Sequence, residues 1–272
     1  MPDALVDAVI AAARDAGRLA LDRAGTDYRR WEKAPGQPVC DVDLAVDRML
    51  KQRLREIDPD AGWLSEETAD DSARLGCARA WVVDPIDGTR DYLRARAGWC
   101  VSVALVEDGQ PVLGVLEAPA LGQTWLARAG AGAWRNGVAL TASRRTELPG
   151  ARVPAETLPR GDADLVAVPR PNSIALRMAM VAADEADLCA SVRWGHEWDI
   201  AAAALLVEEA GARVTDALGV PIRYNSRGGE AFGVLASAPG IHTAAIARLG
   251  ERAYAAHARQ DGGEGSRPSP RA

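Results

Sequence analysis

Two aspartates, Asp84 and Asp87, lie three positions apart between a short apolar run and a Gly-Thr pair. The apolar run, residues 81–83, predicts a buried strand that stops at Pro85. The Gly-Thr pair begins a stretch that can form a helix. Carboxylates at a strand end suit a hard cation such as Mg²⁺, and the N–H groups at a helix start can hold a phosphate. The segment therefore indicates phosphate-ester chemistry beside a metal ion.

The same segment has a simpler interpretation as a solvated turn, because Asp-Pro and Asp-Gly are common turn pairs. Two other segments favour the metal site over the turn. Glu66 and Glu67 follow a Trp-Leu pair, and Asp199 follows Trp198 directly. Acids held against large apolar side chains are what a buried metal site requires. A purely structural role gives no reason for this arrangement.

One class of phosphatase is excluded by a single position. Phosphatases of the haloacid dehalogenase type use Asp-x-Asp-Gly-Thr, in which the first Asp is the nucleophile. Here Pro85 stands two residues before Asp87. A covalent aspartyl-phosphate route is therefore not expected.

Composition narrows the class further. The 272 residues, 48% of them hydrophobic, suffice for one large domain or two modest ones. The net charge of −6 comes without a basic stripe, so a nucleic-acid polymer is not an expected partner. No signal peptide and no run of about 18 apolar residues is present, which predicts a cytoplasmic protein without membrane insertion. Four scattered cysteines and only three histidines exclude a His-rich zinc site and favour Mg²⁺.

Apolar periodicity and turn residues predict the elements. Helices are expected at residues 3–24, 41–57 with Asp41 as N-cap, 173–183, 199–210 and 242–256. Strands are expected at 101–106 and 112–116, joined by an Asp-Gly turn, and at 123–126, 132–140, 214–215 and 232–236. Residues 25–40 predict a loop or hairpin. We expect subdomains at 1–140, carrying most metal ligands, and 141–258, followed by a disordered tail at 259–272.

Three motifs together resemble the inositol monophosphatase superfamily of Mg²⁺-dependent, Li⁺-sensitive phosphatases. The central motif is the Asp84–Thr89 segment. Ser65-Glu66-Glu67 stands where the family usually has Gly-Glu-Glu, and Trp198-Asp199 matches its C-terminal motif. Residues 39–43, which end in Asp43, correspond to a fourth, looser pattern. The likeness covers residues 5–256. It implies an α+β fold, a layered α-β-α-β-α sandwich whose two subdomains meet at the metal site.

The resemblance also implies roles for individual residues. Two Mg²⁺ ions would be held by four carboxylates and one backbone carbonyl: Glu66, Asp84, Ile86 (the carbonyl), Asp87 and Asp199. A third, weaker Mg²⁺ site would involve Glu66 and Glu67. The implied catalytic residues are Asp43, Glu66 and Thr89, with Asp43 and Thr89 hydrogen-bonded to orient the attacking water. The implied substrate-binding residues are Asp87, Gly88, Thr89, Arg177, Glu197 and Asp199.

For several of these residues, a purely structural role is the alternative to a role in catalysis or binding. Asp43 could be only an acid in the first turn of a helix, and Glu67 could lie on the surface. Lys33 could be a surface residue or could approach the substrate phosphate. We interpret Trp198 as a packing residue and His196 as a hydrogen-bonded loop histidine.

Within the superfamily, Arg90-Asp91-Tyr92 and Glu197-Trp198-Asp199 look most like the bacterial 3'(2'),5'-bisphosphate nucleotidases. That branch converts 3'-phosphoadenosine 5'-phosphate to AMP and phosphate, a step of sulfur metabolism. A second phosphate would need a cation, for which the candidates are Arg170, Arg177 and Arg193. The alternative for each of them is a surface or structural arginine. Asn172 stands where the branch has Gly, and residues 150–170 are short and rich in Pro. Both departures from the nucleotidase pattern lie in segments that set substrate specificity in the family.

Two other functions remain open. One is an inositol-1-monophosphatase or another sugar-phosphate phosphatase. The other, from a different class, is a catalytically silent homologue that binds Mg²⁺ or a ligand. The intact acid set argues against the silent homologue. The resemblance also implies a possible homodimer, since many relatives dimerise, although the nucleotidase branch is often monomeric.

Overall fold

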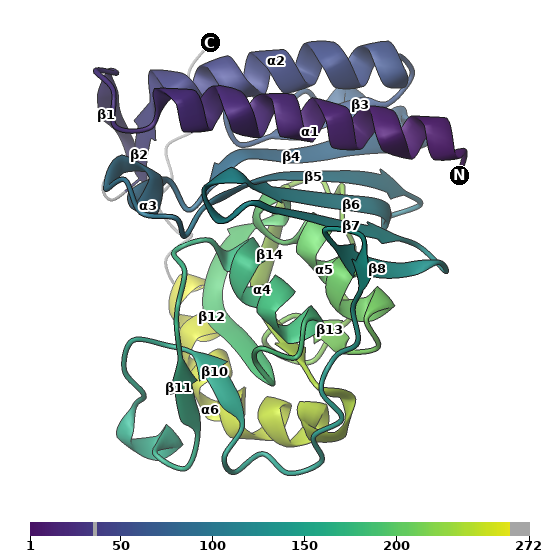
Figure 1. The fold of residues 1–272 in the computed structure, drawn as a ribbon. Coiled ribbons are helices and arrows are strands. Elements are labelled where there is room, and N and C mark those ends of the chain that lie inside the picture. Colours follow the sequence, from purple (N-terminus) through teal and green to yellow (C-terminus); the bar gives the residue numbers. More distant parts are fainter. Residues whose placement is uncertain (35–36, 262–272) are drawn as a thin grey trace.

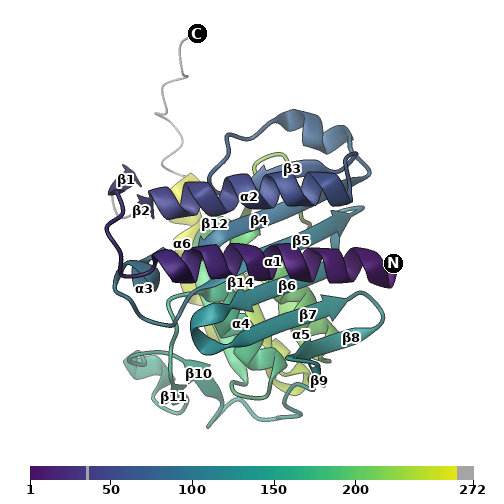
Figure 2. The same cartoon turned by 45° about the horizontal axis from the view of Figure 1, so that its top comes forward.

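The two N-terminal helices form the outer layer of the molecule. The computed structural model describes residues 1–34 and 37–261, and in it α1 (Asp3–Arg23) and α2 (Asp41–Ile57) lie side by side over one face of a sheet (Figure 1, Figure 2). Both helices carry apolar residues at intervals of three and four, and those residues face the sheet. Val9, Ala13, Val46 and Leu50 are fully buried there.

The sheet under these helices has seven strands in chain order. They are β3 (Gly62–Ser65), β4 (Arg79–Asp87), β5 (Cys100–Glu107), β6 (Gln110–Ala118), β7 (Gln123–Arg128), β8 (Gly132–Arg135) and β9 (Val138–Ala139). Within this seven-stranded sheet, β3 and β4 pair in parallel and the other neighbours pair antiparallel. The predicted Asp-Gly hairpin joins β5 to β6, and Asp108 and Gly109 adopt the positive φ angles, 51° and 77°, that such turns require.

Both faces of this sheet are covered, which explains its continuous apolar runs. Successive residues of a strand point to opposite faces. Trp81 and Val83 therefore pack under α1 and α2, while Val82 packs into a second core on the other side. That second core is closed by α4 (Ile174–Ala182) and α5 (Ala201–Glu209).

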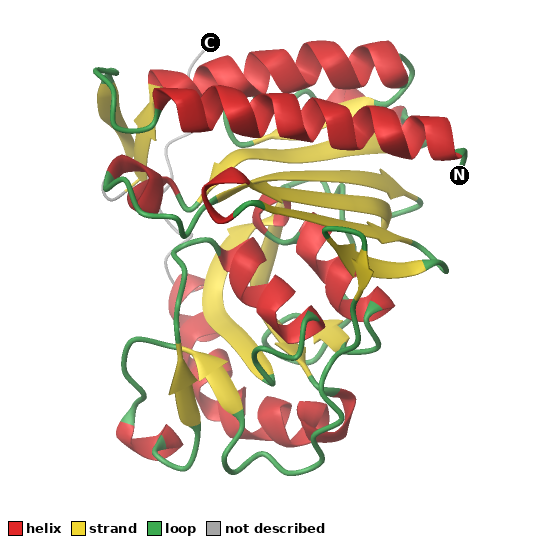
Figure 3. Ribbon diagram, viewed as in Figure 1, coloured by secondary structure: helices red, strands yellow, loops and turns green. Residues whose placement is uncertain are grey.

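A second, smaller sheet lies beneath α4 and α5 (Figure 3). It has the order β12-β14-β13, formed by Leu188–His196, Glu230–Ser237 and Arg213–Thr215, all antiparallel. The last helix, α6 (His242–Asp261), packs on its far face. Helix, sheet, helix, sheet and helix thus alternate, and the expected layered α+β sandwich is confirmed.

Short elements complete the description. β1 (Arg30–Ala34) and β2 (Gln37–Cys40) form an antiparallel pair before α2, and β10 (Arg152–Pro154) pairs in parallel with β11 (Val166–Val168). A five-residue helix, α3 (Thr89–Leu93), follows β4. The 3₁₀ turns are Ser72–Gly76, Pro119–Leu121, Arg160–Asp162, Glu197–Asp199 and Pro239–Ile241.

The structure corrects two local predictions. β4 does not stop at Pro85 but continues to Asp87, because a bulge between Asp84 and Asp87 accommodates the proline. The N-cap of α2 is Cys40 rather than Asp41. There the carboxylate of Asp43, in the first turn, accepts the Cys40 backbone N–H at 2.9 Å.

The expected subdomains, residues 1–140 and 141–258, contact each other. α5, from residues 141–258, packs on β5 to β8 of the first sheet, so the two halves share one layer. The boundary near 140 stays a proposal. The predicted disordered tail lies, from residue 262 on, outside the described residues. No helix in the described part of the chain is long and apolar enough to cross a membrane.

Candidate active site

A cavity of about 440 Å³ opens where β3, β4, α3 and the 3₁₀ turn at Glu197–Asp199 meet the β1–β2 hairpin. Its walls come from segments that are far apart in the chain. They include five of the predicted site residues with charged or polar chemistry, Glu66, Asp84, Asp87, Thr89 and Asp199, together with Ile86 and Gly88. The remaining lining residues are Lys33, Pro38, Arg90, Asn172, His196 and Trp198.

The bulge in β4 places Asp84 and Asp87 at this cavity. Asp84 is paired with Ser102 and Asp87 with Cys100, so two residues of β4 are left without a partner in register. The Ile86 N–H donates to Asp84 Oδ1 at 2.9 Å, and the Thr89 hydroxyl donates to the Ile86 carbonyl at 3.0 Å. These bonds hold the turn between strand and helix in a fixed shape.

Gly88 makes this turn possible. Its φ angle of 95° is one that side chains with a Cβ rarely adopt, and a Cβ there would lie 2.7 Å from the carbonyl oxygen of Gly98. Gly88 is also the N-cap of α3. The first N–H groups of a helix have no partner inside it, and Gly88 and Thr89, where α3 begins, both line the cavity.

Asp87 lies at the N-terminus of α4. Its carboxylate accepts the Ser173 hydroxyl, the Ala175 N–H at 2.7 Å and the Ile174 N–H at 3.3 Å. Burial raises the pKa of Asp87 to about 6, although these hydrogen bonds and the charge of Arg177 act in the opposite direction. Asp87 therefore joins the two layers and faces the cavity.

Asp84 and Asp199 are buried carboxylates with like charges close to them. Burial, followed by the charges of Glu66 and Asp87, raises the pKa of Asp84 well above its usual range. Burial and then Asp87 raise the pKa of Asp199 in the same way, and Asp199 is close enough to Asp84 for a hydrogen bond between the two carboxyl groups. Buried like charges at this spacing need protons or a cation.

Lys33 supplies one cation from the β1–β2 hairpin. Its ammonium group pairs with Glu66 at 3.3 Å and, more closely, with Glu67. Burial lowers and the two glutamates raise the pKa of Lys33, with a net increase. Burial raises the pKa of Glu67 to about 7. Of the alternatives open for Lys33 and Glu67, the structure supports a cavity position for Lys33 and a buried one for Glu67.

Asp43 does not line the cavity, although it lies close enough to influence the charges there. Its Oδ2 accepts from the N–H and thiol of Cys40, while its Oδ1 is buried with no hydrogen-bond partner among the described residues. Burial raises the pKa of Asp43 to about 6. The expected hydrogen bond between Asp43 and Thr89 is not formed, because the Thr89 hydroxyl donates to Ile86 instead.

Two predicted substrate-binding residues lie outside this cavity. Glu197 is fully buried and accepts the Ser226 N–H, which makes it a support for the neighbouring loop. Arg177 donates to the backbone carbonyls of Asn172 and Ser173 and lines two adjoining cavities. The sequence motif could not show the position of Glu197, since it depends on a contact with Ser226, 29 residues away.

The structure also places the residues of two further motif segments, His196 with Trp198 and residues 90–92. His196 and Trp198 both line the cavity and stack on each other with ring centroids 4.2 Å apart. Of Arg90, Asp91 and Tyr92, only Arg90 lines it. Asp91 accepts the Asn172 N–H at 3.0 Å, and Tyr92 is buried with its hydroxyl donating to Ala20. The His196–Trp198 stack is a flat wall that sequence reasoning missed.

The donor set fits a hard metal ion in its chemistry. Carboxylate oxygens surround the cavity, beside a backbone carbonyl, and their repulsion is the property that a divalent cation relieves. Among residues 1–34 and 37–261, however, no three His, Cys, Asp or Glu side chains are arranged to hold a metal as they stand. Asp87 is held by α4, and Glu66 by Lys33. Metal binding would therefore require these side chains to reorient.

Comparison with known proteins assigns a family to this arrangement. Residues 1–254 match the sequence model of the inositol monophosphatase family. A histidinol-phosphatase from Mycobacterium tuberculosis is 35% identical over 210 residues, which cover 71% of this chain and 80% of the relative. A 3'(2'),5'-bisphosphate nucleotidase, CysQ, from Escherichia coli is 31% identical over 206 residues, covering 72% and 82%. An IMPase structure from Thermotoga maritima superposes with a TM-score of 0.80 at 27% identity, covering 92% and 98%.

Proposed function

We propose that the substrate of this protein carries two anionic groups. The premise is its family, since the chain belongs to the inositol monophosphatase family and is a hydrolase of phosphate monoesters. The reaction we propose is that of a 3'(2'),5'-bisphosphate nucleotidase, the conversion of 3'-phosphoadenosine 5'-phosphate to AMP and phosphate. The family is generally metal-dependent, and we propose Mg²⁺ as the metal because the donors are oxygens.

The observation that carries this proposal is a chain of adjoining cavities. A cavity of about 210 Å³ shares His196 and Asp199 with the carboxylate cavity. It shares Arg177 and Arg193 with a third cavity of about 580 Å³. A ligand whose phosphate lies among the carboxylates could therefore extend past His196 toward a group of arginines.

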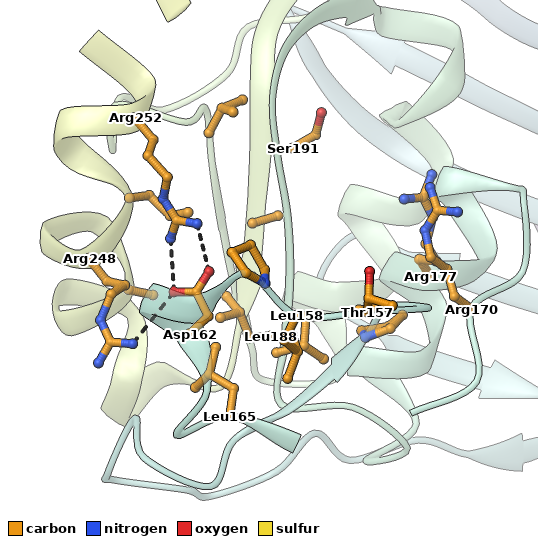
Figure 4. Close-up of a pocket in the computed structure, with 18 of the residues that line it drawn as sticks. Thr157, Leu158, Asp162, Leu165, Arg170, Arg177, Leu188, Ser191, Arg248 and Arg252 are labelled. Carbon is orange, nitrogen blue, oxygen red and sulfur yellow. Dashed lines mark hydrogen bonds and ion pairs between the residues drawn. The ribbon is translucent and has the colours of Figure 1, made fainter. Parts of the chain in front are cut away.

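The third cavity is basic, although the chain is acidic overall (Figure 4). Arg170 and Arg177 lie together at one side of it, and burial and the charge of Arg177 lower the pKa of Arg170. On the other side Arg252 and Arg248 are paired with Asp162. At the Arg170 side, Glu156 pairs with Arg170 at 3.6 Å, while Arg177 donates to backbone carbonyls. That side therefore keeps positive charge, and arginine is the side chain best suited to bind a phosphate in two-point contacts.

This charge distribution distinguishes the substrates named for the relatives. A cationic amino alcohol phosphate, such as histidinol phosphate, would place a positive charge toward arginines. Inositol phosphate would place neutral hydroxyls there. Only a second anion is complementary to Arg170, Arg177 and Arg193. Inositol-1-monophosphatase activity is the second candidate, and it rests on the likeness to the Thermotoga maritima IMPase.

We assign the residues as follows. Glu66, Asp84, Asp87, Asp199 and the Ile86 carbonyl would hold the cation, which would acidify a water and neutralise phosphate charge when bound. The N–H groups of Gly88 and Thr89 would donate to the phosphate. The Thr89 hydroxyl would orient the attacking water, with Asp43 near enough to favour a positive charge in the site. The His196–Trp198 stack would contact the leaving group.

The matched pair of 3'-phosphoadenosine 5'-phosphate and adenosine 3'-monophosphate tests the role of the arginines, because the two differ only in the second phosphate. Arg193→Gln and Arg170→Gln should each raise KM for the bisphosphate about tenfold, the effect of losing one charged hydrogen bond. KM for the monophosphate should stay unchanged. Steady-state phosphate release measures both constants.

Arg248→Gln is the control for this experiment. Arg248 lines the same cavity, but its charge is neutralised by Asp162 and Asp164. It should leave both KM values unchanged. Equal effects of Arg193→Gln on the two nucleotides would overturn the bisphosphate assignment and leave the phosphatase activity standing.

Replacing Thr89 by Ala should lower kcat by about 10- to 100-fold, with a smaller change in KM, because a group that positions the reacting water acts mainly in the transition state. Thr89→Ser retains the hydroxyl and should keep most of the activity. Phosphate release at saturating substrate measures the effect. An unchanged kcat in Thr89→Ala would remove this residue from the mechanism.

A further inference from the structure

Arg74 is a buried charge that the proposed reaction does not use. It lies in the 3₁₀ turn Ser72–Gly76 and is only 2% exposed. Its guanidinium donates to both carboxylate oxygens of Asp70, at 2.6 and 2.9 Å. It also donates to the Asn225 side chain at 2.6 Å and to the Ser226 carbonyl at 2.8 Å. One side chain thus joins two segments about 150 residues apart in sequence.

The segment that Arg74 reaches supports the turn carrying Asp199. The Ser226 N–H donates to Glu197 at 3.1 and 3.3 Å, and the Glu197 N–H donates to the Gly229 carbonyl at 2.9 Å. Glu197 is fully buried and belongs to the same 3₁₀ turn as Asp199. Gly229 lies against Trp198, since a Cβ there would be 3.8 Å from its ring. The loop 225–229 therefore fixes the position of this turn.

The other end of the connection lies beside β3. A Cβ at Gly62, the first residue of β3, would lie 2.7 Å from Arg74 Cβ, so the backbone of the 3₁₀ turn packs directly on that strand. Glu66 follows the last residue of β3 and lines the carboxylate cavity. Arg74 consequently connects the strand that presents Glu66 with the loop that supports Asp199.

We propose that Arg74 is a positioning residue that sets the separation of Glu66 and Asp199, and through it the affinity of the site for a divalent cation. The proposal rests on the proposed function, because it assumes that these carboxylates hold the cation. Residues that orient metal ligands without touching the metal change metal affinity by about 10- to 100-fold when they are removed.

The test compares Arg74→Met with the wild type in two titrations with Mg²⁺. One follows the rise in Tm, and the other follows phosphate release. The half-saturating Mg²⁺ concentration should increase about tenfold in both. Arg74→Lys keeps the charge but cannot form the forked contacts, so it should give an intermediate value. A calorimetric titration with Mn²⁺ gives the same comparison without any substrate.

Arg152→Met is the matched control. Arg152 also clamps two segments, through Asp184 and Asp187, but it lies away from the carboxylate cavity. Its loss should lower Tm and leave the half-saturating Mg²⁺ concentration unchanged. A structural role alone would make the two variants behave alike.

A further comparison shows whether Arg74 acts through Glu197. Glu197→Leu removes the oxygens that accept the Ser226 N–H. If the route is the one inferred, Arg74→Met combined with Glu197→Leu should raise the half-saturating Mg²⁺ concentration no more than the larger single change. Fully additive effects would contradict the route through Glu197.

The inference is overturned if Arg74→Met lowers Tm but binds Mg²⁺ as the wild type does. If Arg74→Met does not fold, Arg74→Lys decides in the same way. A wild-type protein whose Tm and activity respond to no divalent cation overturns the proposed function, and this inference with it. If the wild type responds to Mg²⁺ and Arg74→Lys has the same half-saturating Mg²⁺ concentration as the wild type, this inference alone is overturned.

Discussion

Replacing Asp84 by Asn is expected to lower kcat about a thousandfold, because a lost metal ligand removes several kcal/mol of transition-state stabilisation and each 1.36 kcal/mol is a factor of ten. The same change should raise the Tm of the metal-free protein. Asp84 is buried beside Glu66, Asp87 and Asp199, and this crowding raises its pKa well above the usual range. A neutral amide removes that repulsion and can still accept the Ile86 N–H.

Loss of activity together with a gain in stability identifies a functional site, because such a site keeps unfavourable interactions that activity requires. Phosphate release and thermal unfolding in the presence of EDTA measure them. Asp60→Asn, at an exposed position, should change neither. An Asp84→Asn enzyme with activity within about tenfold of the wild type, or with a lower Tm in EDTA, would contradict the role of Asp84.

The second large effect concerns pH. The metal-free protein should be less stable at about pH 8 than at about pH 5, and Mg²⁺ should abolish the difference. Asp43 and Asp87 have pKa values of about 6 and Glu67 of about 7 in the folded chain, raised chiefly by burial. In the unfolded chain such groups titrate near about pH 4.

The direction of the pH effect follows from proton binding. Between about pH 4 and about pH 7 the folded protein holds protons that the unfolded chain has released, so stability falls as pH rises through this window. Above it, the charged carboxylates repel each other unless a cation is bound. Mg²⁺ should therefore raise Tm by several degrees at about pH 8 and little at about pH 5. Scanning calorimetry with Mg²⁺ or EDTA gives all four values.

Asp84→Asn provides the internal control, since it should weaken the pH dependence in EDTA without removing it, because burial chiefly raises the pKa values of Asp43, Asp87 and Glu67. A metal-free wild type that is equally stable at both pH values would show that the carboxylates are not in conflict. A Tm that rises with pH would have the same meaning.

Local patterns in the sequence predicted most of the fold. The 3.6-residue periodicity of α1 and α2, the Asp-Gly turn between β5 and β6, and Gly211 after α5 each depend on neighbours a few residues away. These features follow rules that hold in any chain. The layered architecture came from the family resemblance and is confirmed by the structure.

Features that depend on distant partners were not predicted. β12 was missed because only part of it is buried and its pairing with β14 is interrupted between Ser191 and Trp194. β10 and β11 pair in parallel across a connection without regular strand pattern. The continuation of β4 past Pro85 depends on a bulge opposite β5, which nothing in residues 79–87 reveals.

For the site, as for the fold, local motifs were predictive and contacts between distant segments were not predicted. The motifs identified Glu66, Asp84, Asp87 and Asp199, and the structure brings all four to one cavity. The role of Glu197 depends on Ser226, 29 residues away, and the route from Arg74 depends on a contact between residues about 150 apart. The hydrogen bond expected between Asp43 and Thr89 depended on side-chain rotation, which a sequence motif does not encode.

The most direct test of the central claim is phosphate release with Mg²⁺ from 3'-phosphoadenosine 5'-phosphate and inositol 1-phosphate in parallel, with and without Li⁺. We predict Mg²⁺-dependent, Li⁺-inhibited release with a large preference for the bisphosphate. A preference for the inositol ester would contradict the role of the arginine-lined cavity and leave the phosphatase assignment intact. No release from either ester, with a Tm that still rises with Mg²⁺, would contradict the proposed reaction and favour a silent, ligand-binding member of the family.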